Sequence, residues 1–261
     1  MVDCKSCNQR FRADQVPDHC KKEDLTEPRQ FNLMFKTAVG PVEDKDSFAY
    51  LRPETAQSIF LAFPWLLRQN RGKLPMAGAQ IGRSFRNEIS PRQGPLRMRE
   101  FTQMEVEHFF LPSDEPKLSD ELRNITINLL TANGNETNST VGEAFDSGII
   151  GSSLVACHLA RAQHFLVTIG VPSGKLRFRQ HGSNEMAHYS SDCWYGEINT
   201  SLGWIETIGV AHRGDYDLSA HGKASSKEFV IAKSLFTCNN NSDNFSFLLI
   251  ADLVFVAILY L

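Results

Sequence analysis

Two strand-forming segments joined by a loop with proline and glycine constrain the fold of this chain more than any other feature. IGRSFRNE at residues 81–88 predicts a strand, SPRQGPLR at 90–97 a loop, and MREFTQMEVEHFF at 98–110 a second strand. One face of the second strand carries a polar set with a single aromatic ring: Arg99, Phe101, Gln103 and Glu105. The other face is mostly a packing set: Met98, Thr102, Met104 and Val106. We therefore predict a long hairpin whose polar face is a ligand surface, with a solvated outer face as the alternative.

The composition is that of a globular protein with one large or two small domains. Of its 261 residues, 42% are hydrophobic and 22% are charged. The net charge of −3 gives no general attraction to nucleic acid, so any RNA binding has to be local. The first residues lack the apolar core of a secretory signal, and the cysteines are scattered, so reduced thiols are expected. We expect a cytoplasmic protein, with a mitochondrial location as the alternative.

The first cysteines have part of a metal-binding spacing. Cys4 and Cys7 form a C-x-x-C pair, and His19 and Cys20 follow as an adjacent pair. A structural zinc site needs four well-placed ligands, and an adjacent histidine–cysteine pair has poor spacing for its second half. We therefore expect turn cysteines and do not expect zinc at Cys4 and Cys7.

Helical periodicity marks residues 51–70, LRPETAQSIFLAFPWLLRQN. This pattern predicts a helix with Pro53 in its first turn and Glu54 at its positive end. Pro64 inside the segment should kink or split the helix. Residues 112–175 are interpreted as a helical and polar insertion. It is expected to hold a helix from Ser119, a loop over NGNETNST at 133–140 and a helix over 152–171.

Residues 176–228 return to short strands and turns, and a different tail follows. In WIETIGV, Trp204, Glu206 and Ile208 are expected on one face, where a carboxylate is costly without a partner or ligand. FSFLLIADLVFVAILYL at residues 245–261 is almost wholly apolar. It fits a membrane anchor, a buried strand or helix, or sequence that is not native to the protein. We favour the third interpretation, because the similarity described below stops near residue 228.

An arginine-based nucleotide site is the chemistry that the hairpin supports. Neither G-x-x-x-x-G-K-[ST] nor G-x-G-x-x-G occurs, and guanidinium groups can hold phosphate instead. The arginines that line the expected triphosphate site are Arg86, Arg97 and Arg99. Phe101 would stack on a base, and Glu88 would accept from an exocyclic amine. Glu54 and Glu105 would hold a small ammonium group. This set favours acyl activation, in which a carboxylate attacks the α-phosphate and arginines hold the developing charge.

Further motifs occur in order along the chain. They are FNLMFKTAVGP at 31–41, YLRPETAQSIF at 50–60, GAQIGRSFRNE at 78–88, EMAHYSSDCW at 185–194 and GWIETIGVAHRGDYDLSAH at 203–221. Together with the hairpin, which resembles motif 2 of class II aminoacyl-tRNA synthetases, they resemble the glycyl-tRNA synthetases of the archaeal and eukaryotic type. The resemblance covers residues 1–111 and 176–228, and several independent motifs make it specific.

The resemblance implies roles for particular residues. ATP contacts are implied at Arg86, Asn87, Glu88, Arg97, Met98, Phe101, Glu206, Thr207 and Arg213. Arg86 and Arg99 are the candidate catalytic residues, Glu54 and Glu105 are expected to hold the glycine ammonium, and Glu206 is expected to contact Mg²⁺. The implied partners are glycine, ATP as its Mg²⁺ complex and tRNA(Gly), in a family that forms homodimers; no membrane partner is expected.

The resemblance also implies an α+β fold, with an antiparallel sheet flanked by helices. Motif 1 and motif 3 of the class are not found, so an incomplete sheet with an unpaired edge is expected. The positions that depart from the family pattern are Pro95, Met98, Tyr195, Gly196 and His212.

The expected organisation is an N-terminal segment with the C-x-x-C pair, a core, an insertion, a continued core and a divergent tail. Their bounds are 1–30, 31–111, 112–175, 176–228 and 229–261. We favour a truncated glycine–tRNA ligase core, which forms glycyl-adenylate and transfers glycine to tRNA(Gly). The alternatives are a non-catalytic short isoform or binding module that keeps part of the pocket, and a membrane-tethered protein.

Overall fold

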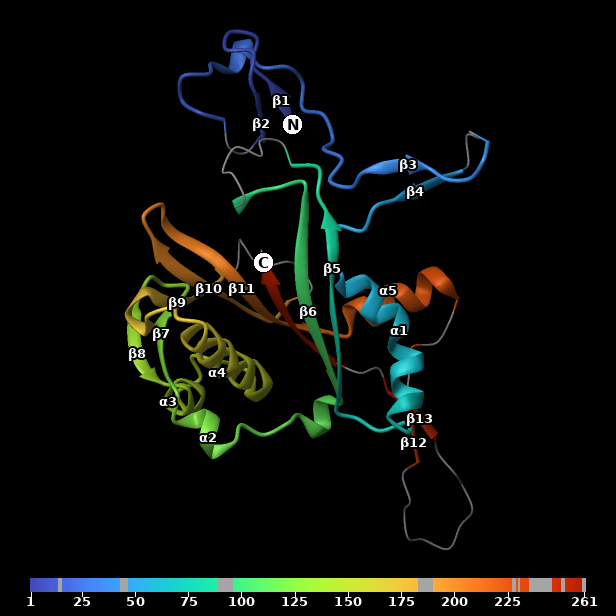
Figure 1. The fold of residues 1–261 in the computed structure, drawn as a ribbon, viewed down its shortest axis with the longest axis vertical. Coiled ribbons are helices and arrows are strands. Elements are labelled where there is room, and N and C mark those ends of the chain that lie inside the picture. The colour runs from blue at the N-terminus through green and yellow to red at the C-terminus, as the bar shows by residue number, and fades with distance from the viewer. Residues whose placement is uncertain are drawn as a thin grey trace, which may run out of the picture. The chain divides into compact units, whose positions relative to one another are not determined.

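The computed structural model describes residues 1–13, 16–42, 47–88, 96–182, 190–226, 229, 231–234, 246–249 and 252–259, the last three ranges as backbone only. The chain forms two compact units (Figure 1). The first unit comprises Met1–Glu54 and Arg83–Thr102, and the second comprises Thr55–Gly82 and Gln103–Leu261. The division falls within β5 (Met76–Phe85) and β6 (Glu100–Phe110), the two strands of the predicted hairpin.

The first unit contains little regular structure. β1 (Val2–Asp3) pairs with β2 (Arg10–Phe11), and β3 (Lys36–Ala38) pairs with β4 (Phe48–Tyr50). A single 3₁₀ turn, η1 (Lys22–Asp24), lies between these ladders. Among the described residues before position 55, the buried hydrophobic side chains are Val2, Cys4 and Cys20. This segment therefore has almost no apolar core.

An eight-stranded sheet organises the second unit. Its strand order is β5-β6-β14-β11-β10-β9-β7-β8. The remaining strands of this sheet are β7 (Thr126–Leu130), β8 (Glu136–Thr140), β9 (Leu176–Gln180), β10 (Asp192–Thr200), β11 (Gly203–Gly214) and β14 (Asp252–Leu259). The registered pairs are antiparallel except β7 with β9, which is parallel. The α+β class with a largely antiparallel sheet is therefore confirmed.

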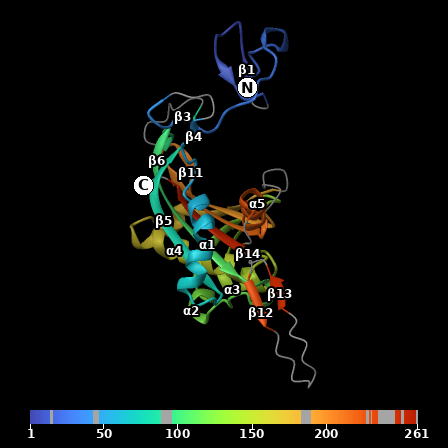
Figure 2. The same cartoon turned by 90° about the vertical axis from the view of Figure 1, so that its right-hand side faces the viewer.

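The tail supplies one strand of this sheet. β14 pairs with β6 on one side and with β11 on the other. The expectation of an unpaired edge at this point is therefore wrong, and the backbone agrees with the strand interpretation of the tail. β12 (Ile231–Ser234) and β13 (Ser246–Leu249) form a separate ladder (Figure 2). Among the residues that the structure describes, no helix has the length and apolar character needed to cross a bilayer.

Helices cover both faces of the sheet. α3 (Val141–Asp146) and α4 (Ser153–Thr168) share an apolar core with Phe110, whereas α1 (Ala56–Gln69) and α5 (Tyr216–Ser225) share another with Phe109. Because consecutive side chains of a strand point to opposite faces, these helix pairs lie on opposite sides of β6 (Figure 1). Three single turns, η3 (Pro112–Asp114), α2 (Asp120–Arg123) and η4 (Ser173–Lys175), connect the elements.

The helix predictions located α1 and α4, whereas the helix expected from Ser119 is a single turn, α2. α1 begins at Ala56, so Pro53 and Glu54 precede it, and Pro64 does not split it. The helix predicted over 152–171 is confirmed as α4, whose N-terminus is capped by Ser152. The predicted loop over 133–140 is wrong, because residues 136–140 form β8 and pair with β7.

Candidate functional site

The first unit brings together the residues at the two inner ends of the hairpin. Arg99 donates from Nε and Nη2 to the carbonyl of Glu88, at 3.3 and 3.1 Å. Arg86 donates from Nε to the carbonyl of Pro53, at 3.0 Å. Its guanidinium carbon lies 5.4 Å from the centre of the Phe101 ring, a cation–π distance. Arg86, Glu88, Arg99 and Phe101, which the sequence predicted to act together, are therefore close in space.

Asn87 fixes this corner to the segment before it. Its side-chain amide donates to the carbonyl of Asn32 at 3.0 Å, and its backbone N–H donates to the carbonyl of Leu33 at 2.8 Å. The family motif around residue 31 and the motif ending at residue 88 thus meet. Arg97 and Met98 are exposed, Glu54 is partly buried, and residues 89–95, including Pro95, lie outside the described residues.

A pocket of about 310 Å³ opens beside these residues, within the first unit. Its lining includes Asn87, Glu88 and Arg99. Arg10 and Arg29 also line it, and both pair with Asp3. A set of guanidinium groups around one pocket suits a phosphate-bearing ligand. Sequence reasoning missed Arg10 and Arg29, because neither belongs to a motif and both lie far from the hairpin in sequence.

In the second unit, Glu105 lies fully buried at the N-terminus of α1. Its Oε2 accepts from the Thr55 hydroxyl and, at 2.6 Å, from the Ala56 N–H. Its Oε1 accepts from the Gln103 amide at 2.9 Å. Backbone N–H groups at a helix N-terminus lack partners within the helix and favour negative charge, which explains how this carboxylate is kept in the interior.

The faces of β6 alternate as predicted, but their environments differ from the prediction. Phe101, Gln103 and Glu105 are buried, whereas Met104 and Val106 are only partly buried. The face with the polar side chains is thus the interior face over this stretch. The solvated alternative is wrong for Gln103 and Glu105, since a buried polar group needs hydrogen-bond partners and these two have them.

A β-bulge changes the expected face of one residue on β11. Glu206 pairs with Glu197 and Ile208 pairs with Gly196, so Thr207 is an extra residue between them. The extra residue reverses the alternation, and Ile208 joins the apolar core while Glu206 lies on the opposite face. The prediction that Trp204, Glu206 and Ile208 share one face is therefore wrong for Ile208. Thr207 donates its hydroxyl to the Gly196 carbonyl at 3.0 Å.

Glu206 lies on a face with other charged groups. Its cross-strand neighbour Glu197 accepts from Arg177 at 2.8 Å and from Arg179 at 2.9 Å, so the charge of Glu197 is compensated. Mg²⁺ in nucleotide sites is held by one or two carboxylates together with the substrate phosphates. Half-buried Glu206 fits that donor pattern.

Arg213 makes a buried bidentate ion pair with Asp217. Its Nε and Nη2 donate to the two carboxylate oxygens at 2.7 and 2.8 Å. His212, one of the departures from the family pattern, lies with Nδ1 2.9 Å from the Ser191 hydroxyl. The preceding part of the EMAHYSSDCW motif, residues 185–189, lies outside the described residues.

Comparisons with known proteins identify relatives of this chain. Residues 35–144 match the tRNA synthetase class II core domain (G, H, P, S and T). "Glycine--tRNA ligase 1, mitochondrial" of Saccharomyces cerevisiae is 49% identical over 221 residues, covering 82% of this chain and 32% of the relative. "Glycine--tRNA ligase" of Caenorhabditis elegans is 49% identical over 220 residues, covering 81% of this chain and 29% of the relative. "Glycine--tRNA ligase" of Methanothrix thermoacetophila is 42% identical over 265 residues, covering 88% of this chain and 45% of the relative.

The fold has a counterpart among solved structures. Giardia lamblia prolyl-tRNA synthetase in complex with prolyl-adenylate matches with a TM-score of 0.52 at 15% identity, over 87% of this chain and 35% of that one. The chain spans less than half of the length of these curated relatives. The sequence relatives and the shared core agree on one assignment, and this chain belongs to the glycyl-tRNA synthetase family of class II aminoacyl-tRNA synthetases.

Proposed function

We propose that the chain activates glycine with ATP and transfers it to tRNA(Gly), as a glycine–tRNA ligase. The observation that carries the proposal is the 49% identity to a glycine–tRNA ligase over 221 residues. The clustering of Arg86, Asn87, Glu88 and Arg99 beside an arginine-lined pocket supports the nucleotide part.

Activation joins the glycine carboxylate to the α-phosphate of ATP. A carboxylate oxygen forms a bond to the α-phosphorus, the bond to the bridging oxygen breaks, and pyrophosphate leaves with its electron pair. Negative charge builds on the phosphate oxygens in this step, and fixed guanidinium groups stabilise it without reorganising. We assign this role to Arg86 and Arg99, further ATP contacts to Arg97, Met98, Glu206, Thr207 and Arg213, and the adenine contact to Phe101.

Glycine offers an ammonium group and no side chain to hold. We assign the ammonium to Glu54 and Glu105 and expect selectivity to come from excluding any larger amino acid. Mg²⁺, held at Glu206 and by ATP, would neutralise phosphate charge. The adenylate would then pass glycine to the terminal hydroxyl of tRNA(Gly) and release AMP. A homodimer and a cytoplasmic location, with the mitochondrion as the alternative, complete the proposal.

Glycine-dependent ATP–pyrophosphate exchange, measured on this chain, tests activation directly. Exchange with glycine and none with alanine would support the proposal. ATP binding by calorimetry without any exchange would refute catalysis by this chain and favour the binding-module alternative. A chain that neither binds ATP nor exchanges would refute both.

Arg86→Ala gives the residue-level test. Removing a charge-stabilising group should lower exchange by about 10²-fold or more. Arg83→Ala is a matched control, because Arg83 lies on β5, three residues before Arg86, and its exposed side chain pairs with exposed Glu100. Its exchange should stay within about twofold of the parent, since surface substitutions have small effects. Equal rates for Arg86→Ala and the parent would show that the phosphate-binding assignment is wrong.

A further inference from the structure

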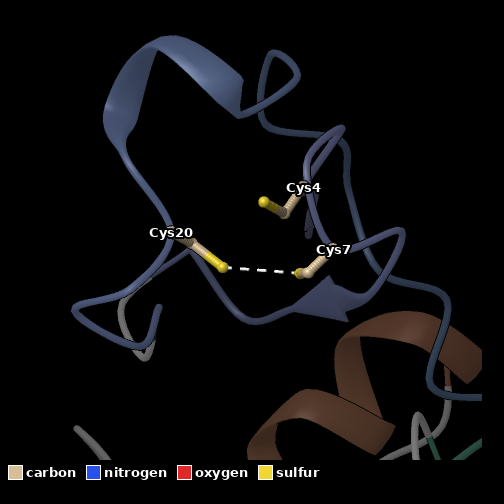
Figure 3. Close-up of side chains that lie close together, drawn as sticks. All are labelled: Cys4, Cys7 and Cys20. Carbon is tan, nitrogen blue, oxygen red and sulfur yellow. Dashed lines mark hydrogen bonds between the residues drawn. The ribbon is translucent and has the colours of Figure 1, made fainter.

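Three cysteines converge at the N-terminal end of the first unit. The thiols of Cys4, Cys7 and Cys20 turn toward one another, and all their sulfur atoms lie within 4.8 Å (Figure 3). The sulfurs of Cys7 and Cys20 are 3.5 Å apart, and none of the three is in a disulfide. Cys20, which is 13 residues from Cys7 in sequence, is thus brought to the C-x-x-C pair by the fold.

This spacing agrees with thiolates around one tetrahedral metal ion. A Zn–S bond of about 2.3 Å and tetrahedral angles place ligand sulfurs about 3.8 Å from each other. The Cys7 and Cys20 sulfurs, 3.5 Å apart, lie close to this value, and the other sulfur pairs are within 4.8 Å. Backbone pairing also fixes Cys4 in place. Its N–H donates to the Gln9 carbonyl at 2.8 Å, and it forms an isolated antiparallel β-bridge with Leu25.

The surrounding segment has little else to stabilise it. Two of its three buried hydrophobic residues before position 55, among those the structure describes, are cysteines of this cluster. Its strands β1 and β2 have two residues each. Segments too small to bury a core are commonly stabilised by a metal ion or by disulfides.

We propose that Cys4, Cys7 and Cys20 bind one Zn²⁺ ion, with a nitrogen or oxygen atom completing the tetrahedron, and that this ion stabilises the N-terminal segment. The site goes beyond the proposed ligase function and does not depend on it. It also replaces the expectation of simple turn cysteines: the C-x-x-C spacing gave two ligands, and folding supplies the third.

Thiols bind a metal ion as thiolates. A divalent cation would displace their protons into solvent and compensate the thiolate charges, so metal affinity should fall as the pH falls.

Metal content and X-ray absorption of the full 261-residue chain test the proposal. The chain is purified under reducing conditions and dialysed against a metal-free buffer. We expect about one zinc per chain and an absorption spectrum fitted by three sulfur atoms at about 2.3 Å and one lighter atom. Cys20→Ser should lose the metal, and Cys157→Ser, which alters a buried thiol on α4, should keep it.

Two results would overturn the site. One is a reduced chain that takes up no zinc or Co²⁺ while its thiols react freely. The other is a Cys7–Cys20 disulfide in chain kept under mild reductant, which would make the cluster a redox pair. If Cys20→Ser does not fold, the number of sulfur ligands that X-ray absorption finds around zinc in the parent protein still tests the site. Chelation of the parent should also speed protease cleavage before residue 55, and unchanged cleavage would contradict the stabilising role.

Discussion

Replacing Glu105 tests whether this buried carboxylate holds the N-terminus of α1 in place. Glu105→Ala would leave the Thr55 hydroxyl, the Ala56 N–H and the Gln103 amide without this acceptor in the interior. Each hydrogen bond to a charged group contributes about 1.5–3 kcal/mol, and the contributions are not additive. Removing one partner from a buried charged network typically costs about 3–5 kcal/mol. We therefore expect the free energy of unfolding to fall by about 4 kcal/mol.

Glu105→Gln separates the charge from the shape of the side chain. The amide keeps the volume and one carbonyl oxygen, which can still accept from Thr55 and Ala56. Its NH₂ group would face Gln103, whose own amide can turn and accept from it. The loss should then be limited to the charge at a helix N-terminus, about 1–2 kcal/mol. Glu100→Ala, an exposed carboxylate on the same strand, is the control and should change stability by less than about 0.5 kcal/mol.

Urea unfolding followed by circular dichroism measures these differences. The urea midpoint should fall most for Glu105→Ala, less for Glu105→Gln and least for Glu100→Ala. The slope of the unfolding free energy against urea concentration should stay the same. A decrease in the free energy of unfolding below about 1 kcal/mol for Glu105→Ala would refute the reasoning, because buried donors left without an acceptor cost more than that. If Glu105→Gln lowers the free energy of unfolding as much as Glu105→Ala does, the charge of Glu105 contributes more to stability than its hydrogen bonds do. The glycine-binding role is then tested with Glu105→Gln, whose exchange rate should fall by about 10²-fold while the protein stays folded.

Three further substitutions probe the second unit. Burial, with the charges of neighbouring groups, lowers the pKa of His158 from 6.5 to about 3, so the unfolded chain binds more protons between these values. The contribution of His158 to the free energy of unfolding should therefore fall by about 2 kcal/mol from pH 6.5 to 5. Unfolding measured at each pH should show that His158→Leu loses this contribution and that exposed His164→Leu keeps it. Asp217→Asn removes the carboxylate that pairs with buried Arg213. The free energy of unfolding should fall by about 3–5 kcal/mol, and the midpoint of thermal unfolding should fall with it. A Cβ on Gly78 would lie 2.8 Å from Ile59 Cγ2, so Gly78→Ala should lower the free energy of unfolding in urea by about 1–3 kcal/mol.

Sequence reasoning worked best where the contacts are local or set by one hairpin. Helical periodicity located α4 within a few residues, and alternation assigned the faces of β6. The cluster of Arg86, Glu88 and Arg99 was predictable because a hairpin brings the inner ends of its strands together. Each of these depends on a periodicity that the sequence displays directly.

It failed where partners come from distant parts of the chain. Alternation says which residues share a face but not which face becomes the interior, and two of the donors to Glu105 lie 49 and 50 residues before it. The bulge at Thr207 depends on pairing with β10, which no pattern inside WIETIGV reveals. Arg10 and Arg29 reach their pocket, and Cys20 its cluster, only through the tertiary fold.

The buried position of Glu105 also bears on the proposed glycine site. Burying a carboxylate is unfavourable unless fixed donors compensate for lost water, and the first turn of α1 supplies such donors. The same contacts fix the carboxylate in one orientation before any ligand arrives. An ammonium group that binds there would meet an acceptor that needs no reorganisation, which is how a ligand as small as glycine can be bound through few contacts. The residue that stabilises α1 would then also set the geometry of amino-acid recognition, so stability and specificity at this position should change together in a series of Glu105 variants.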